Sequence, residues 1–251
     1  MWLCKKVIFE HDPKWEDFLK DVYPVPAKLN IPTWYKNLKH TAEYKTIKGC
    51  IPFLDSLTAG YILKIPQDLY INHNVMNKEI NQIDSFFKPA LDYDYSVLSN
   101  KFNINLNGSN KPDTHPPSQL GSECPYHKKN KDLPFYKILN PFVIKTPPGY
   151  STLFVPPLNN RDDRFEIISG IVDTDIFKTE INFPIIINGD KYPTLETTLK
   201  RGTPYVQCIP FKRDDWKMEI KKGNKNRAMN WLLPFLKDNY KKLIWKKKKW
   251  N

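Results

Sequence analysis

The residues best suited to bind a metal ion are the five histidines and four cysteines of the chain. Cys124 and His127 form a C-x-x-H pair, which has the spacing of zinc ligands. We therefore take His115, Cys124 and His127 as candidate metal ligands, with a loop that carries incidental polar residues as the alternative. The sequence contains no H-x-D or H-x-H, the pairs expected of a non-haem iron oxygenase.

Motifs for nucleophilic and phosphate chemistry are absent from the sequence. There is no G-x-S-x-G, no Walker pattern and no G-x-G-x-x-G among the nine glycines. A hydrolase triad and a nucleotide-dependent α/β enzyme therefore have no motif to support them.

Three blocks in the second half of the chain carry the clearest pattern. They are Thr146-Pro-Pro-Gly-Tyr-Ser-Thr-Leu-Phe-Val-Pro156, Ser169-Gly-Ile-Val-Asp-Thr-Asp175 and Lys200-Arg-Gly-Thr-Pro-Tyr-Val-Gln-Cys-Ile-Pro210. Their order and spacing resemble the second half of the trimeric dUTPases and dCTP deaminases, which have the β-clip fold. The resemblance implies a strand, a D-x-D hairpin and a further strand.

The resemblance also implies roles for single residues. Asp173 would order an attacking water, with Asp175 beside it, and Gln207 would lie near the phosphates. A carboxylate at a tight hairpin can act as a general base on water. We take Asp173, Asp175 and Gln207 as candidate catalytic residues. The candidate ligand-binding residues are Arg161, Tyr150 and His115.

Three departures fall on the catalytic parts of this family. Its P-R-S segment has no match before Arg161, Ile176 stands in place of an aromatic residue, and the glycine-rich C-terminal motif is absent. In the alternative interpretation, Asp173 and Asp175 form a turn and Gln207 faces solvent or a loop.

A second resemblance covers nearly the whole chain. Ile31-Pro-Thr-Trp-Tyr-Lys, Cys50-Ile-Pro-Phe-Leu-Asp and Ile209-Pro-Phe-Lys-Arg213 are similar to segments of a family from marine phages and some bacteria. That family has no assigned activity, so the resemblance implies a genomic setting and no reaction.

The net charge of +12 is concentrated at the end of the chain. Residues 211–251 hold 14 basic and 4 acidic side chains, so the rest of the chain is nearly neutral. The last residues form a candidate anion-binding tail of Trp245, Lys246, Lys247, Lys248, Lys249 and Trp250. Such a tail could bind nucleic acid weakly and without sequence preference, lie on an anionic membrane, or pack on the body with solvated lysines.

The 22 prolines predict short strands and ordered loops rather than long helices. Asp12 and Pro13 favour a helix start, and Gly60 a helix end. We expect helices at 12–22, 31–38 and 51–59, and an amphipathic helix from Met229 to Ile244. The predicted strands are 5–9, 61–65 paired with 68–71, 102–106, 142–145, 151–155, 165–172, 181–187 and 205–210.

We therefore expect one compact, mainly β domain, a β-sandwich or β-clip-like fold with short N-terminal helices and a C-terminal amphipathic helix. Residues 1–60 would be a helical segment, 61–210 the β core with long loops at 72–135, and 211–251 a basic helical tail. Without a secretion signal, an apolar span or paired cysteines, the cytoplasm (of a host, if the chain is phage-encoded) is the expected location.

The functional expectation is a phage-type protein that binds a small anionic ligand between the 50s-to-60s strands and the 150-to-175 hairpins. Two alternatives remain: a structural protein of a virion or complex, which would be a homo-oligomer, and a metal-dependent oxygenase or nucleotide hydrolase. The sequence indicates no particular cofactor.

Overall fold

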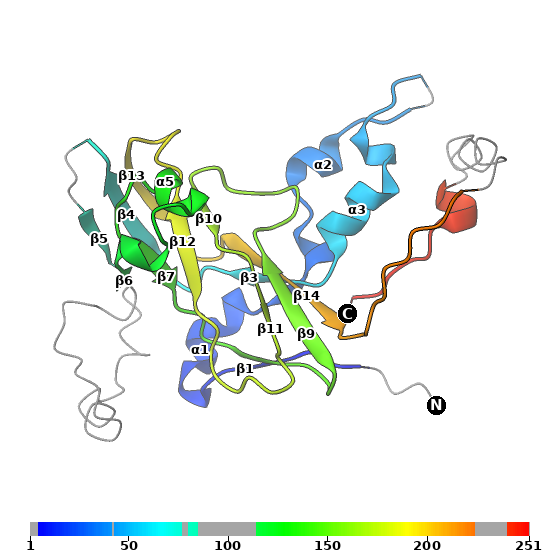
Figure 1. The fold of residues 1–251 in the computed structure, drawn as a ribbon, viewed down its shortest axis with the longest axis horizontal. Coiled ribbons are helices and arrows are strands. Elements are labelled where there is room, and N and C mark those ends of the chain that lie inside the picture. Colours follow the sequence, from blue (N-terminus) through cyan, green and yellow to red (C-terminus); the bar gives the residue numbers. More distant parts are fainter. Residues whose placement is uncertain (1–4, 42, 77–79, 85–113, 224–239, 251) are drawn as a thin grey trace.

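Antiparallel strands dominate the fold (Figure 1). The computed structural model describes residues 5–41, 43–76, 80–84, 114–223 and 240–250. Their strands form sheets ordered β11-β9-β14-β3-β2, β10-β12-β7-β6, β13-β4-β5 and β1-β8. The expectation of a mainly β protein with short helices is confirmed. The strands are β1 (Ile8–Glu10), β2 (Val25–Pro26), β3 (Tyr61–Lys64), β4 (Leu69–Asn74), β5 (Ile80–Asp84), β6 (Thr114–His115), β7 (Phe135–Ile138), β8 (Val143–Lys145), β9 (Tyr150–Val155), β10 (Phe165–Ile167), β11 (Gly170–Val172), β12 (Phe183–Ile187), β13 (Thr194–Leu199) and β14 (Pro204–Lys212).

The helices are short, as the proline content predicts. None in the described part of the chain has the length and apolarity needed to cross a membrane. The α-helices are α1 (Glu16–Leu19), α2 (Thr33–Asn37), α3 (Ile51–Thr58) and α5 (Pro125–Lys129). The 3-10 helices are η1 (Pro13–Trp15), η2 (Lys20–Val22), η3 (Ala27–Asn30), η4 (Ile47–Gly49) and η6 (Pro117–Gln119), and η7 (Tyr240–Ile244) is a π-helical turn.

Local sequence signals are confirmed at two helices. The Asp12 side chain accepts a hydrogen bond from the Lys14 amide, and Pro13 occupies the first turn of η1. At the other helix, α3 ends one residue before Ala59, and Gly60 then adopts a φ of +66°. This left-handed conformation suits glycine and turns the chain into β3.

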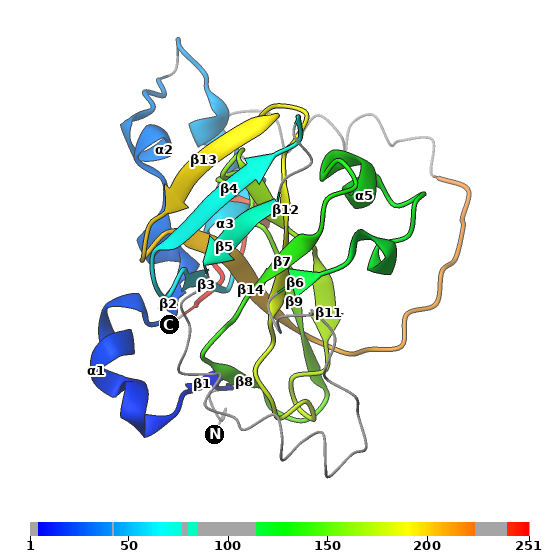
Figure 2. The ribbon, with the colours of Figure 1, turned by 90° about the vertical axis from the view of Figure 1, so that its left-hand side faces the viewer.

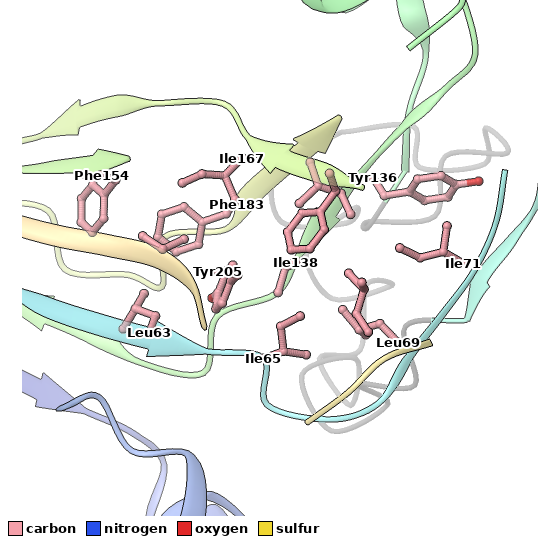
Figure 3. Close-up of a cluster of buried hydrophobic side chains, with 14 of the residues drawn as sticks. Leu63, Ile65, Leu69, Ile71, Tyr136, Ile138, Phe154, Ile167, Phe183 and Tyr205 are labelled. Carbon is pink, nitrogen blue, oxygen red and sulfur yellow. The ribbon is translucent and has the colours of Figure 1, made fainter. Parts of the chain in front are cut away.

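One large hydrophobic cluster joins the two largest sheets and the β13-β4-β5 sheet. Figure 3 shows Phe154, Phe183 and Tyr205 packed in it, with Ile71 and Tyr136 at its other end. Figure 2 shows β4 lying between β13 and β5. The burial of this cluster is the main source of stability available to the fold.

The predicted pairing of the 61–65 and 68–71 strands is wrong. The backbone of Ile65 bonds to residues 202 and 203, since its amide donates to the Thr203 carbonyl and its carbonyl accepts from the Gly202 amide. β3 therefore pairs with β14 and β2, whereas β4 pairs with β13 and β5.

Two other predictions about strands also need correction. The predicted 165–172 strand is divided between two sheets, because the Ile168 amide still bonds to Pro184 whereas Gly170 already pairs with Phe154. The 72–135 region contains β5, β6 and α5 in addition to loops, and β13 was not predicted. The predicted 102–106 strand lies outside the described residues, as does the predicted terminal helix up to residue 239.

Candidate functional site

Asp173 and Asp175 lie together just after β11, the strand that pairs with β9, and both contact Arg213. The Arg213 guanidinium donates to Asp175 from both terminal nitrogens, and its Nη1 atom lies 3.2 Å from Asp173 Oδ1. Asp175 Oδ2 also accepts from the Gly149 amide at 2.8 Å, and the Ser151 hydroxyl donates to Asp173 at 2.6 Å. The cluster therefore ties the turn before β9 and the turn after β11 to the end of β14.

One guanidinium, that of Arg213, serves both carboxylates of this cluster and binds Asp175 more closely than Asp173. The bonds from Arg213, then the Gly149 amide, lower the pKa of Asp175 to about 2 despite partial desolvation. Asp175 in turn raises the pKa of Arg213. A carboxylate held in this way is a poor base, so the arrangement serves best as a clamp.

Asp175→Asn is expected to destabilise the fold, and most clearly above pH 5. A lowered pKa means that the Asp175 carboxylate stabilises the folded state above its unfolded pKa near 3.8, and that this contribution is lost as the pH falls toward 2. Urea unfolding between pH 2 and 7 would measure this contribution. The difference in free energy of unfolding between the wild type and the variant should close as the pH falls below 4. Asp21→Asn, at an exposed position, is the control. Parallel stability curves for wild type and Asp175→Asn would contradict the assignment.

Gln207 lies in the interior of the sheet, with 1% of its surface exposed. Its Oε1 atom accepts from the Leu158 amide, and its Nε2 atom donates to the carbonyls of Ser56 and Ala59. The side chain thus joins α3 to the loop after β9. All of these partners are backbone groups.

Tyr150 and His115 lie on different sheets. The Tyr150 hydroxyl is bonded by Lys5, whose ammonium also lies 4.6 Å from the centre of the Tyr150 ring. His115, in β6, stacks on Phe135 with ring centres 5.1 Å apart. Burial, followed by the charge of Lys137, lowers the pKa of His115. These two residues therefore do not share one ligand site.

The candidate metal ligands make other contacts. Cys124 precedes α5, and His127 within α5 pairs with Asp132 at 2.7 Å. Among the described residues, no three His, Cys, Asp or Glu side chains are grouped so that they could hold a metal ion. The described part of the chain therefore offers no metal centre.

A small pocket lies where the 156–162 loop meets β10 and the start of β14. Its empty volume is about 200 Å³, including space open to solvent. The β14 register shifts between Pro204 and Val206, which marks a bulge at Tyr205, and bulges redirect side chains. We predicted a pocket between the 50s-to-60s strands and the 150-to-175 hairpins. In the sheet, β14 separates β3 from β9, so the observed pocket is a different one. The charged residues lining it are Arg161, Asp162 and Glu166.

The two carboxylates of the pocket already have close cations. Asp162 accepts hydrogen bonds from the guanidinium of Arg164, at 2.9 Å from Nε to Oδ1, and Glu166 pairs with Lys129. By contrast, Arg161 reaches Glu166 only at 3.9 Å, and 57% of its side chain is exposed. The guanidinium of Arg161 is therefore the pocket cation with the weakest internal partner.

Tyr205 also lines this pocket, and its hydroxyl is buried. The residue is 2% exposed, and its hydroxyl has no hydrogen-bond partner in the structure. Burial raises the pKa of this hydroxyl well above its usual value, so it is a donor at neutral pH. An unpaired buried hydroxyl is costly, and a ligand or a water could satisfy it.

The end of the chain folds back onto α3 and β3. The Trp245 indole N–H donates to both carboxylate oxygens of Asp55, at 3.0 and 3.1 Å, and Lys248 pairs with the same carboxylate. Trp250 packs edge to face on Tyr61, with ring centres 6.2 Å apart. Lys246, Lys247 and Lys249 remain exposed.

The sequence-based list of site residues omitted Ser151, Arg213 and Tyr205. Arg213 lies 38 positions after Asp175, so only the pairing of β14 with β9 brings it to that carboxylate, and Tyr205 stands at a bulge that no local pattern predicts. Pro156-Pro157 before Arg161 and Pro204 before Tyr205 were visible in the sequence but indicated only turns. Comparisons with protein-family models, curated proteins and solved structures found no match for this chain.

Proposed function

We propose that the protein binds a small oxyanion, a carboxylate or a phosphate, in the pocket between the 156–162 loop, β10 and β14. The observation that carries the proposal is that one pocket is lined both by Arg161, whose guanidinium has only a 3.9 Å ion pair, and by Tyr205, whose buried hydroxyl has no partner. Both groups are hydrogen-bond donors, which is what an oxyanion requires.

The pocket limits the size and charge of the ligand. The enclosed part of the pocket measures only about 10 Å³, roughly the room that one water needs, so a ligand would place only its terminal atoms inside and the rest at the open mouth beside Arg161. Asp162 and Glu166 would repel an anion, but Arg164 and Lys129 offset them. The proposal includes no chemical step, because each carboxylate in the pocket is held by its own cation.

We also propose that the protein is an atypical relative of the dUTPase-like proteins with a β-clip-like core. Support comes from the order of the three sequence blocks, which fall on β9, β11 and β14, neighbouring strands of one sheet. The role proposed for this protein is binding, since Gln207 bonds only backbone groups and Asp175 is held by Arg213.

Arg161→Gln is expected to weaken binding of inorganic phosphate or a short carboxylate by about 10- to 100-fold, the range of a charge-assisted hydrogen bond. Isothermal titration calorimetry with each anion separately would measure the change. Lys217→Gln, which removes one charge from an exposed position elsewhere, should leave the affinity unchanged. If neither anion binds the wild type at millimolar concentration, the proposal fails.

Tyr205→Phe tests the second donor. Its effects on the stability of the ligand-free protein and on anion binding should have opposite signs. Removing an unsatisfied buried hydroxyl should raise the free energy of unfolding of the ligand-free protein by about 1 kcal/mol, while anion binding becomes weaker. Urea unfolding with and without phosphate separates the two effects. Equal phosphate stabilisation of the wild type and Tyr205→Phe would exclude Tyr205 from the site.

A further inference from the structure

Two basic segments, residues 28–60 and 240–250, meet at α3. Phe53 of α3 packs against α2, through ring contacts with Trp34 and Tyr35 at 6.1 and 5.8 Å. Asp55, two positions later and so on the other side of the helix, holds residues 245–250, here called the C-terminal strap. Figure 1 shows α3 between α2 and the C-terminal segment.

This end of the molecule is strongly basic. Residues 28–60 and 240–250 together contain eleven lysines but only two acidic residues, Glu43 and Asp55. Asp55 is already paired with Lys248. The exposed lysines of the two segments include Lys36, Lys39, Lys45, Lys246, Lys247 and Lys249.

Exposed aromatic rings accompany these lysines. Trp34 is 46% exposed and Tyr44 is 65% exposed. The Trp34 ring also has edge-to-face contacts with Tyr35 and Phe53, which hold its orientation. A fixed aromatic ring beside lysines is the combination that binds single-stranded nucleic acid without sequence preference.

We propose that α2, α3 and the C-terminal strap form one composite surface for single-stranded nucleic acid. In this arrangement the strap lysines contact phosphates on one flank of α3, and a base stacks on Trp34 on the other. A helix with its side chains is about 10–12 Å across, so a surface that reaches from one flank of α3 to the other would span a few nucleotides. The pocket at Arg161 plays no part in this proposal.

The docking of the strap favours nucleic acid over a membrane. A membrane anchor would insert its tryptophans, but the Trp245 indole N–H is bonded to Asp55 and the Trp250 ring packs on Tyr61. The side chains that the strap presents to solvent are lysines. Exposed Leu243 and Ile244 precede the strap, so vesicle binding is a necessary comparison.

The first test uses fluorescence anisotropy of the full chain with a 20-nucleotide oligo-dT at several salt concentrations. Alanine at Lys246, Lys247 and Lys249 together should reduce the slope of log affinity against log salt by about 2, since single strands give roughly 0.7 per phosphate contact. Trp34→Ala should weaken binding about tenfold with the slope unchanged, because stacking is not ionic. Alanine at Lys20, Lys128 and Lys178, three exposed lysines outside this surface, is the matched control.

The second test asks whether the strap must be docked. Trp245→Phe keeps the net charge but removes the indole N–H that bonds to Asp55, so it should weaken oligonucleotide binding several-fold. Trp245→Ala is the stronger version, and circular dichroism would show that both variants keep the fold. Unchanged affinity in both would overturn the composite surface, as would equal effects of the two triple-lysine variants. Binding to vesicles of phosphatidylglycerol and phosphatidylcholine without binding to oligo-dT would also overturn it.

Discussion

Gly60→Ala is expected to destabilise the protein by about 3–5 kcal/mol, enough to unfold much of a protein of ordinary stability. The φ of Gly60 is +66°, a conformation that costs an alanine about 1–2 kcal/mol. A Cβ atom at this position would also lie 1.9 Å from the Cys208 carbonyl oxygen, a backbone atom that cannot move without displacing β14. The Gly60 carbonyl accepts from the Ala27 amide as well, so a shift at this residue would disturb η3.

Alanine substitutions at two other glycines separate the cost of the positive φ from the cost of the steric clash. Gly202 has a φ of +84° but open space around its Cβ position, so Gly202→Ala should cost about 1 kcal/mol. Gly170 has neither a positive φ nor a neighbour within 4 Å, so Gly170→Ala should change stability very little. Urea unfolding of the three variants should rank them in this order. Equal effects of Gly60→Ala and Gly202→Ala would show that the β14 backbone yields to the added methyl group.

The sequence predicted features that depend on neighbouring residues. Asp12 and Pro13 begin a helix because their own backbone and side chain satisfy its first turn, and Gly60 ends α3 because it tolerates a positive φ. Strand pairing depends on distant residues instead. The 61–65 and 68–71 strands look like a hairpin locally, but Ile65 bonds to residues 202 and 203, which no local pattern reveals.

The candidate site also combines features that neighbouring residues predict with features that depend on distant residues. The D-x-D spacing placed Asp173 and Asp175 together correctly, but both contact Arg213, which follows the end of another strand, β14. The charge pattern identified the basic tail, whereas its attachment to Asp55 depends on a helix almost two hundred positions earlier. Tyr205 offered no sequence signal, because its unpaired hydroxyl follows from a bulge and from the packing around it.

Gln207→Met is the second change for which we expect a large effect, about 3 kcal/mol of lost stability. Methionine has a similar volume, so the change removes the amide with little effect on packing. It leaves the part-buried Leu158 amide and the part-buried carbonyls of Ser56 and Ala59 without their partner. Each buried group left unsatisfied costs about 1–3 kcal/mol. Urea unfolding measures the total, with Gln67→Met as the control, because the Gln67 Nε2 atom is buried without a partner and its loss should cost little.

Hydrogen exchange would locate the effect of Gln207→Met. The Leu158 amide bonds to Gln207 and begins the loop that carries Arg161, so its protection should fall much more than that of the Ile65 amide, which bonds to Thr203. Because that loop forms one wall of the pocket, phosphate binding should weaken along with it. Unchanged Leu158 protection and stability would mean that the Gln207 amide does not hold this loop. In that case the role in phosphate chemistry implied by the dUTPase resemblance would again be the better interpretation of Gln207.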